Sequence, residues 1–419
     1  MRQSRLMLLT AAALSLGMLW AVGRIRHRTT RAAASLLTMS EGEIRDLDIA
    51  FYERRAGEDT ASASDRSQLA GLYLQRARTS GSFSDYERAE RAARQSLGLR
   101  TAHNGQTFSL LASALLARHD FVGAHRVAEQ ADSLEPGNRN HVALLGEIEL
   151  ELGDYDAAAR HFASLHFDSD QFTVAARVAR WRELTGHADA ARRLLHAAIA
   201  RVDRRDDLPK EQIAWFHYRL GELELRTGHL DSAEASFLRG LRIFPDDYRI
   251  LGGLSRLESA RRHWQRAIDF GNQAVAVQLD PATLGTISDA YLALGDSLQA
   301  AQYARAMTAS ALEQPGPIHR AWGLFILDHG TPQDAERVLI KTREELRTRH
   351  DVYGYDLLAW ALHRQGRDAE ARVSMRKALA QHTEDPQLSR HAQAIDAAVA
   401  ARTVSSGGGP CQSSRLTCN

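Results

Sequence analysis

A segment of about 34 residues recurs along most of this chain, and this period constrains the fold more than any other feature. The clearest copies are Leu145–Ala158 and Leu220–Ala233, which share a Leu-Gly-Glu start, a turn glycine and an alanine five residues later. Aligned on the turn, eight copies follow one another from residue 105 onward. Each repeat of this length forms one helical hairpin that needs its neighbours to bury its apolar face. We therefore expect an all-α solenoid.

Two further positions of the repeat are constant in all eight copies. The residue five positions after the turn is always alanine, and the residue seven positions before it is always small. A small side chain where two helices of a hairpin cross lets their backbones approach closely. The turn position is glycine in six copies, and His119 and Arg262 replace it in the other two. These two hairpins are expected to close without the conformational freedom of glycine.

This pattern resembles the tetratricopeptide repeat, with Leu-Gly in the first helix, then alanine, a bulky residue and a closing proline. The resemblance covers roughly residues 105–386, and a divergent copy precedes it between Leu69 and Leu99. It implies a right-handed superhelix of helical hairpins. In this family the first helices form a concave face that binds a protein or an extended peptide.

The repeat pattern divides the chain into four parts. We predict an N-terminal segment over 1–31, a connecting segment over 32–66 with a short helix at 41–56, and the solenoid over 67–401. The solenoid contains eight clear repeats, a divergent first repeat, and a capping helix over 387–401 that covers the open end of the stack. Residues 402–419 are predicted to form a flexible tail.

Residues 6–23 form an apolar run of 18 residues without charge, near the lower limit for a membrane-spanning helix. A cleaved secretory signal and an uncleaved anchor are both compatible with this run. We favour the anchor, because the run is longer than a usual signal core and Arg24, Arg26, Arg28 and Arg31 follow it. The predicted location is a membrane, with the repeats exported to a bacterial envelope or periplasm. A soluble exported protein and a cytoplasmic-facing domain are the alternatives.

The net charge of the whole chain is +1, yet residues 1–31 contain six arginines and no carboxylate. The remaining residues therefore carry a net charge of −5, which argues against nucleic acid as a partner. The two cysteines, Cys411 and Cys418, lie in the polar tail and are too few for a structural zinc site. Their pairing stays open.

The repeats leave no segment long enough for a catalytic domain of about 100 residues. The sequence also lacks HExxH, GxSxG, the phosphate-binding GxxxxGK[ST], CxxC and the EF-hand loop. We therefore expect no enzyme activity, no catalytic residue, no cofactor and no metal.

Charged residues alternate in sign at the position six residues before the turn, in the order Glu147, Arg180, Glu222, Arg256 and Asp289. One interpretation is that they line a partner-binding groove together with nearby aromatic and basic side chains. The candidate residues on the concave face are Trp215, Tyr218, Glu222, Arg226, Arg256, Asp289 and Trp360. The other interpretation is a ladder of ion pairs between adjacent repeats, worth little per pair.

The alternation argues against a groove for strongly acidic or strongly basic peptides. The carboxylate-clamp form of this family needs Asn and Lys in these positions, so a receptor for chaperone tails is not expected. The function predicted from the resemblance is a membrane-anchored scaffold or adaptor. The alternative is a non-catalytic regulatory subunit of an envelope secretion, polysaccharide or peptidoglycan assembly.

Overall fold

The computed structural model describes residues 39–165, 171–313 and 318–407, and within these ranges all regular structure is helical. The predicted membrane segment at 6–23 and both cysteines of the tail lie outside the described residues. The chain divides into two compact units, residues 1–60 and 61–419, and each is described by itself.

The first unit contains α2 (Glu41–Glu58), close to the short helix predicted at 41–56. Its start is fixed by a capping box. The Ser40 hydroxyl accepts a hydrogen bond from the main-chain N–H of Glu43, and the Glu43 carboxylate accepts one from the N–H of Ser40. These reciprocal bonds satisfy two of the donors that every helix N-terminus leaves unpaired.

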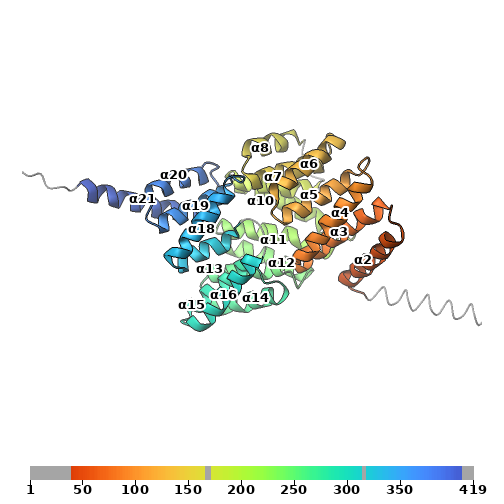
Figure 1. Cartoon of the computed structure of the whole chain (residues 1–419). Coiled ribbons are helices and arrows are strands. Elements are labelled where there is room, and N and C mark those ends of the chain that lie inside the picture. The colour runs from red at the N-terminus through yellow and green to blue at the C-terminus, as the bar shows by residue number, and fades with distance from the viewer. Residues whose placement is uncertain (1–38, 166–170, 314–317, 408–419) are drawn as a thin grey trace, which may run out of the picture. The chain divides into compact units, whose positions relative to one another are not determined.

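The second unit is a run of helical hairpins followed by one last helix (Figure 1). The first hairpins are α3 (Ala63–Ser80) with α4 (Phe83–Leu99), α5 (Gly105–Ala117) with α6 (Phe121–Leu134), α7 (Arg139–Leu152) with α8 (Tyr155–Ser164), and α9 (Phe172–Leu184) with α10 (Ala188–Val202). The next are α11 (Lys210–Arg226) with α12 (Leu230–Ile243), α13 (Tyr248–Ala260) with α14 (Trp264–Val277), α15 (Pro281–Ala293) with α16 (Ser297–Glu313), α17 (Arg320–His329) with α18 (Pro332–Glu345), and α19 (Val352–Arg364) with α20 (Asp368–Ala378).

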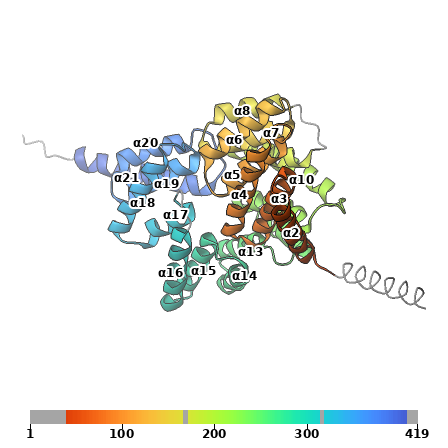
Figure 2. The same ribbon diagram turned by 45° about the vertical axis from the view of Figure 1, so that its right-hand side comes forward.

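The hairpins stack in chain order, as a solenoid requires (Figures 1 and 2). Most first helices contact the first helix of the next hairpin, from α3 with α5 to α17 with α19. Each second helix instead packs between the first helix of its own hairpin and that of the next. The first helices therefore form one face of the array, as the resemblance implies.

The constant small residue is explained by the bulky residue of its own hairpin. A Cβ atom added to Gly146 would lie 2.7 Å from the ring of Phe162, and one added to Gly221 would overlap the ring of Phe237. Phe237 is fully buried, and so is Ala233 at the constant alanine position. The close crossing predicted from the sequence is confirmed in these two hairpins.

The two turns without glycine adopt the conformation that glycine normally supplies. His119 and Arg262 both have φ of 62°, in the left-handed region, beside glycines such as Gly153 and Gly228 at 83°. Both hairpins therefore close without glycine, as expected, but in the same left-handed conformation as the glycine turns. Gly330 is the turn that differs, because its φ of −86° is open to any residue. There Pro332 begins α18, where its missing N–H costs no hydrogen bond.

The last helix, α21 (Pro386–Gly407), packs on the final hairpin and extends six residues beyond the end predicted for the capping helix. Leu388 and Ile395 are fully buried in the same core cluster as Leu357 and Leu362 of α19. The helix therefore covers apolar surface that the stack would otherwise expose. Among residues 39–165, 171–313 and 318–407, we find no helix with both the length and the apolar character to cross a bilayer.

Candidate functional site

The array contacts itself where the loop between α18 and α19 meets the turn between α7 and α8. The main-chain N–H of His350 donates to the carbonyl oxygen of Leu152 at 2.7 Å, and the N–H of Val352 donates to the hydroxyl oxygen of Tyr155 at 2.9 Å. A Cβ atom on Gly153 would overlap the main chain of His350. This close approach joins the third hairpin to the ninth, so we call it the closing contact.

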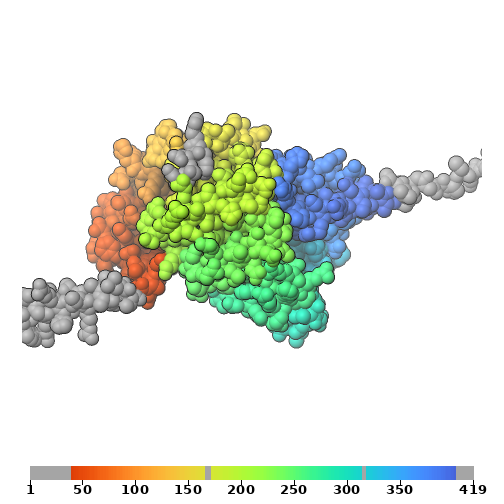
Figure 3. Space-filling view, turned by 180° about the vertical axis from the view of Figure 1, so that it is seen from behind, coloured from red at the N-terminus to blue at the C-terminus, as the bar shows by residue number. Residues whose placement is uncertain are grey.

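A second contact of the same kind joins the fourth hairpin to the loop that precedes α21. The Thr383 hydroxyl, in the loop before α21, donates to the carbonyl oxygen of Leu184 at 2.5 Å. The N–H of Ala188 donates to the Glu384 carboxylate at 3.3 Å. Figure 3 shows the blue surface of the last helices against the yellow-green surface of this part of the chain. The superhelix therefore brings α19 and α21 back against hairpins six repeats earlier.

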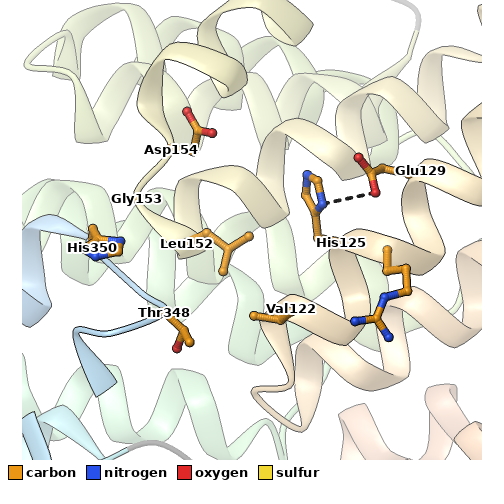
Figure 4. Close-up of a pocket in the computed structure, with 9 residues that line it drawn as sticks. Val122, His125, Glu129, Leu152, Gly153, Asp154, Thr348 and His350 are labelled. Carbon is orange, nitrogen blue, oxygen red and sulfur yellow. Dashed lines mark ion pairs between the residues drawn. The ribbon is translucent and has the colours of Figure 1, made fainter. Parts of the chain in front are cut away.

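A cleft of about 630 Å³ opens beside the closing contact (Figure 4). Gly153 belongs to the α7–α8 turn, Thr348 and His350 come from the α18–α19 loop, and His125 and Glu129 come from α6. His125 Nδ1 lies 3.6 Å from Glu129 Oε2, and its Nε2 lies 3.5 Å from the buried carboxylate of Glu149. His125 therefore lies between two carboxylates, and the exposed Arg126 also lines the cleft.

Ion pairs connect the first helices of consecutive hairpins. In each, a carboxylate of one first helix lies against an arginine or a histidine of the next. The pairs are Glu147–Arg177 (2.7 Å), Glu183–Arg219 (3.1 Å), Glu222–Arg256 (2.6 Å) and Asp289–His329 (2.9 Å). Only Glu222–Arg256 joins two of the alternating positions predicted to pair. The ladder therefore exists, but mostly with partners that the alternation does not indicate.

Glu183 is the most heavily paired carboxylate of this ladder. Its oxygens lie 2.5 Å from Arg226, 3.1 Å from Arg219 and 3.2 Å from Arg180. Burial alone would raise the pKa of Glu183, but Arg226, Arg180 and Arg219 outweigh burial and hold that pKa at about 2. The carboxylate is therefore ionised over the whole physiological pH range.

A second pocket, of about 500 Å³, opens between the two sides of the superhelix, and we call it the arginine pocket. Helices α9, α11 and α13 form one side, and α17, α19 and α21 form the other. Its charged lining consists of Arg180, Arg226, Arg256, Arg320, Arg390, Glu222 and Asp385. Five arginines against two carboxylates leave an excess of three positive charges in the lining.

Tyr353 lies between the two sides of the arginine pocket. Its hydroxyl accepts a hydrogen bond from Arg226 at 3.3 Å, across 127 residues of sequence. The guanidinium of Arg320 lies 4.6 Å from the centre of its ring, within range of a cation–π interaction. Burial alone would lower the pKa of Arg256, yet Glu222 and Tyr218 raise that pKa above its ordinary value. Arg256 therefore remains a cation.

The structure brings together three of the seven candidate residues, Glu222, Arg226 and Arg256, which all line the arginine pocket. Tyr218 packs one turn away, with its ring centre 6.4 Å from that of Phe237, and burial raises its pKa to about 12. Like Tyr218, the remaining three candidates are not among the residues that line the pocket.

Those three candidates make contacts within the array. Trp215 packs in a core cluster with its ring edge-on to Phe216, 5.1 Å between ring centres. Asp289 pairs with His329 on the surface, and Trp360 stacks on His391 of α21 at 4.2 Å. The Trp360 indole N–H also donates to Asp328 at 2.8 Å. Packing and ion pairing within the array therefore explain the positions of these three side chains.

The sequence prediction missed Arg320, Tyr353, Asp385 and Arg390. They are far along the chain from Glu222 and reach the pocket only because the superhelix returns upon itself. No period within a single repeat marks them. Among the residues that the structure describes, no group of three or more His, Cys, Asp or Glu side chains is arranged to hold a metal ion.

Neither the protein-family models nor the curated proteins contain a match to this sequence. Solved structures do match its fold. The human IFIT1 dimer with m7Gppp-AAAA is 15% identical over 76% of this chain and 72% of that chain, with a TM-score of 0.52. A tetratricopeptide repeat protein from Parabacteroides merdae is 16% identical over 70% and 98%, with a TM-score of 0.36. Yeast Tom70 is 12% identical over 87% and 93%, with a TM-score of 0.36.

The recurring Ala and small-residue positions, the hairpins that they build and the likeness to the IFIT1 structure agree with one another. This chain therefore has the fold of a tetratricopeptide repeat protein.

Proposed function

We propose that this chain is a membrane-anchored scaffold or adaptor that binds a protein or extended peptide partner on the inner face of its array. The observation that carries this proposal is the arginine pocket, a solvent-accessible cleft lined by three consecutive first helices and by the returning end of the chain. Convergent polar groups in a preformed cleft are the usual features of a binding site.

A binding role fits the chemistry of the pocket better than a catalytic role. Its carboxylate Glu222 is held by Arg256 at 2.6 Å, and Arg226 is bound to Glu183. A general base needs a free electron pair directed at a substrate proton, and a nucleophile needs an activating base within hydrogen-bond reach. Arginines in such numbers instead recognise anions and fix planar groups by paired hydrogen bonds.

Membrane attachment is the second part of the proposal, and it rests on residues 6–23 of the sequence. A span of this length followed by four arginines would hold the array at a bilayer surface. We further propose that the array is exported and that it performs no chemistry of its own.

The experiment that tests this function is cross-linking of the full-length protein in native membranes, followed by identification of the captured proteins. A discrete set of envelope proteins is the expected result, and one fixed enzyme partner would favour a regulatory subunit instead. Capture of no protein at any cross-linker length would contradict the scaffold. Carbonate extraction of the same membranes tests the anchor, since a cleaved and soluble form would be released. Protease digestion of intact cells tests the export of the array.

A further inference from the structure

Resting on the proposed function, we propose that the partner segment is an acidic peptide whose side-chain carboxylates bind the arginine pocket and join its two sides. The pocket is composite, because Arg180, Arg226 and Arg256 come from α9, α11 and α13, whereas Arg320 and Arg390 come from α17 and α21. A ligand that contacts both groups of arginines also bridges hairpins that lie far apart in the sequence.

The charge of the pocket selects an anion. The lining holds five arginines and two carboxylates. Glu183 and Asp356 pair with Arg226 and Arg320 without lining the pocket, and even with these two included the arginines outnumber the carboxylates. Charges at partly buried sites are weakly screened, so this excess attracts an anion more strongly than exposed arginines do. The alternation of signs in the sequence does not indicate this excess of positive charge, because Arg226, Arg320 and Arg390 lie outside the alternating positions.

Several donors of the pocket are available to a ligand. Arg390 is exposed and makes no hydrogen bond or ion pair with the described residues. Arg256 uses one nitrogen, Nη2, to bind Glu222 at 2.6 Å. A guanidinium has five N–H donors and binds a carboxylate through two parallel hydrogen bonds. Arg256 on one side and Arg390 on the other can therefore each receive a carboxylate.

The pocket suits a peptide better than a nucleic acid. Single-stranded nucleic acid needs exposed aromatic rings on which its bases stack. Tyr353 is the aromatic residue of this lining, and its ring already contacts Arg320 at 4.6 Å and Arg180 at 5.9 Å. A volume of about 500 Å³ accommodates a few residues of an extended chain.

Binding of such a peptide would strengthen the closing contact. The ligand gains its full set of arginines only when α21 lies against α9–α13, so its affinity for the closed array exceeds that for an open one. A ligand that prefers one conformation shifts the population toward it. Hydrogen exchange in the loops at 348–351 and 382–385 should therefore slow when the peptide binds.

The test uses the purified full-length protein in detergent and a fluorescein-labelled hexaglutamate peptide with an amidated C-terminus. Fluorescence anisotropy should show binding that weakens as salt is raised. Arg390→Gln removes a charge at a binding hot spot and should weaken binding. Arg390→Glu reverses that charge and should weaken binding more, by about tenfold. The matched control is Arg376→Glu, which changes an exposed arginine of α20 that is not among the pocket residues.

Two other probes separate the alternatives. Hexaglutamine with a free C-terminus tests whether a terminal carboxylate suffices, and oligouridylate tests nucleic acid. Tighter binding of either probe than of hexaglutamate would overturn the proposal, as would equal effects of the Arg390 and Arg376 variants. Binding without any change in hydrogen exchange at the two loops would overturn the bridging role. If cross-linking captures a partner while hexaglutamate does not bind, the proposed function stands and the acidic peptide is rejected.

Discussion

Arg349 Nε donates a hydrogen bond to the main-chain carbonyl oxygen of Glu151 at 2.8 Å, across 198 residues of sequence. The same guanidinium lies 3.1 Å from the Glu151 carboxylate and 2.9 Å from that of Glu345, and 4.8 Å from the ring centre of Phe121. One side chain therefore holds the α18–α19 loop against the third hairpin.

Arg349→Ala is expected to loosen the closing contact and to lower the free energy of unfolding by about 3 kcal/mol, because it leaves the buried Asp351 without its cation. Arg347→Ala, two residues earlier on an exposed side chain, should change this free energy by less than about 0.5 kcal/mol. Urea denaturation measures both, and hydrogen exchange at residues 150–155 localises the effect. Equal behaviour of the two variants would show that the loop does not depend on Arg349.

Gly153 and Gly228 provide a matched pair at the turns. Both have φ of 83°, so alanine at either position costs about 1–2 kcal/mol in the left-handed region. At Gly153 the added Cβ would also lie 2.5 Å from the main-chain nitrogen of Asp351, whereas nothing lies within 4 Å at Gly228. Gly153→Ala should therefore destabilise the array more than Gly228→Ala in urea denaturation. A smaller loss for Gly153→Ala would contradict the close approach.

The position of the repeat that always holds a small residue can be tested by substitution. Gly221→Ala would force a methyl group into the ring of the buried Phe237 and should cost about 1–3 kcal/mol. Gly98→Ala lies in α4 with no atom within 4 Å of the new Cβ and should stabilise by up to about 1 kcal/mol, through helix propensity. Thermal unfolding followed by circular dichroism distinguishes the two signs. A neutral Gly221→Ala would mean that Phe237 can move aside.

The ladder predicts a specific pH dependence at Glu183. Its pKa is held at about 2, below the ordinary value of 4.5, so its stabilising contribution is fully present above pH 4.5. This contribution is lost as the pH falls through 2, and it amounts to about 3 kcal/mol. Glu183→Gln should therefore lower stability at pH 7 and flatten the loss between pH 4.5 and 2. Urea denaturation across this pH range measures the stability of each variant. The control is Asp289→Asn, which alters an exposed pair of little energetic weight. Parallel curves for wild type and Glu183→Gln would contradict the assignment.

The hairpins could be predicted from the sequence because their contacts are local. Gly221, Ala233 and Phe237 meet within 16 residues, and each position recurs in every copy or most copies. The conformation of His119 and Arg262 could not be predicted from the sequence, since the stacked hairpins force a left-handed φ on residues that disfavour it.

The arginine pocket could be predicted only in part for a related reason. Arg256 holds the alternating repeat position, and Arg226 lies one helical turn after Glu222, which holds that position in its own repeat. Both arginines therefore face the same side. Tyr353 and Arg390 join them through the pitch of the superhelix, which small rotations between successive hairpins accumulate. No single repeat encodes that sum, so residues more than 100 positions apart could not be paired in advance.

Binding of a protein partner in the arginine pocket can be tested on the full-length protein in native membranes. The yield of the cross-linked partner in native membranes should be compared between wild type, Arg390→Glu and the matched control Arg376→Glu. We expect a discrete partner whose yield falls about tenfold in Arg390→Glu and is unchanged in Arg376→Glu. Equal yields in all three proteins would contradict it.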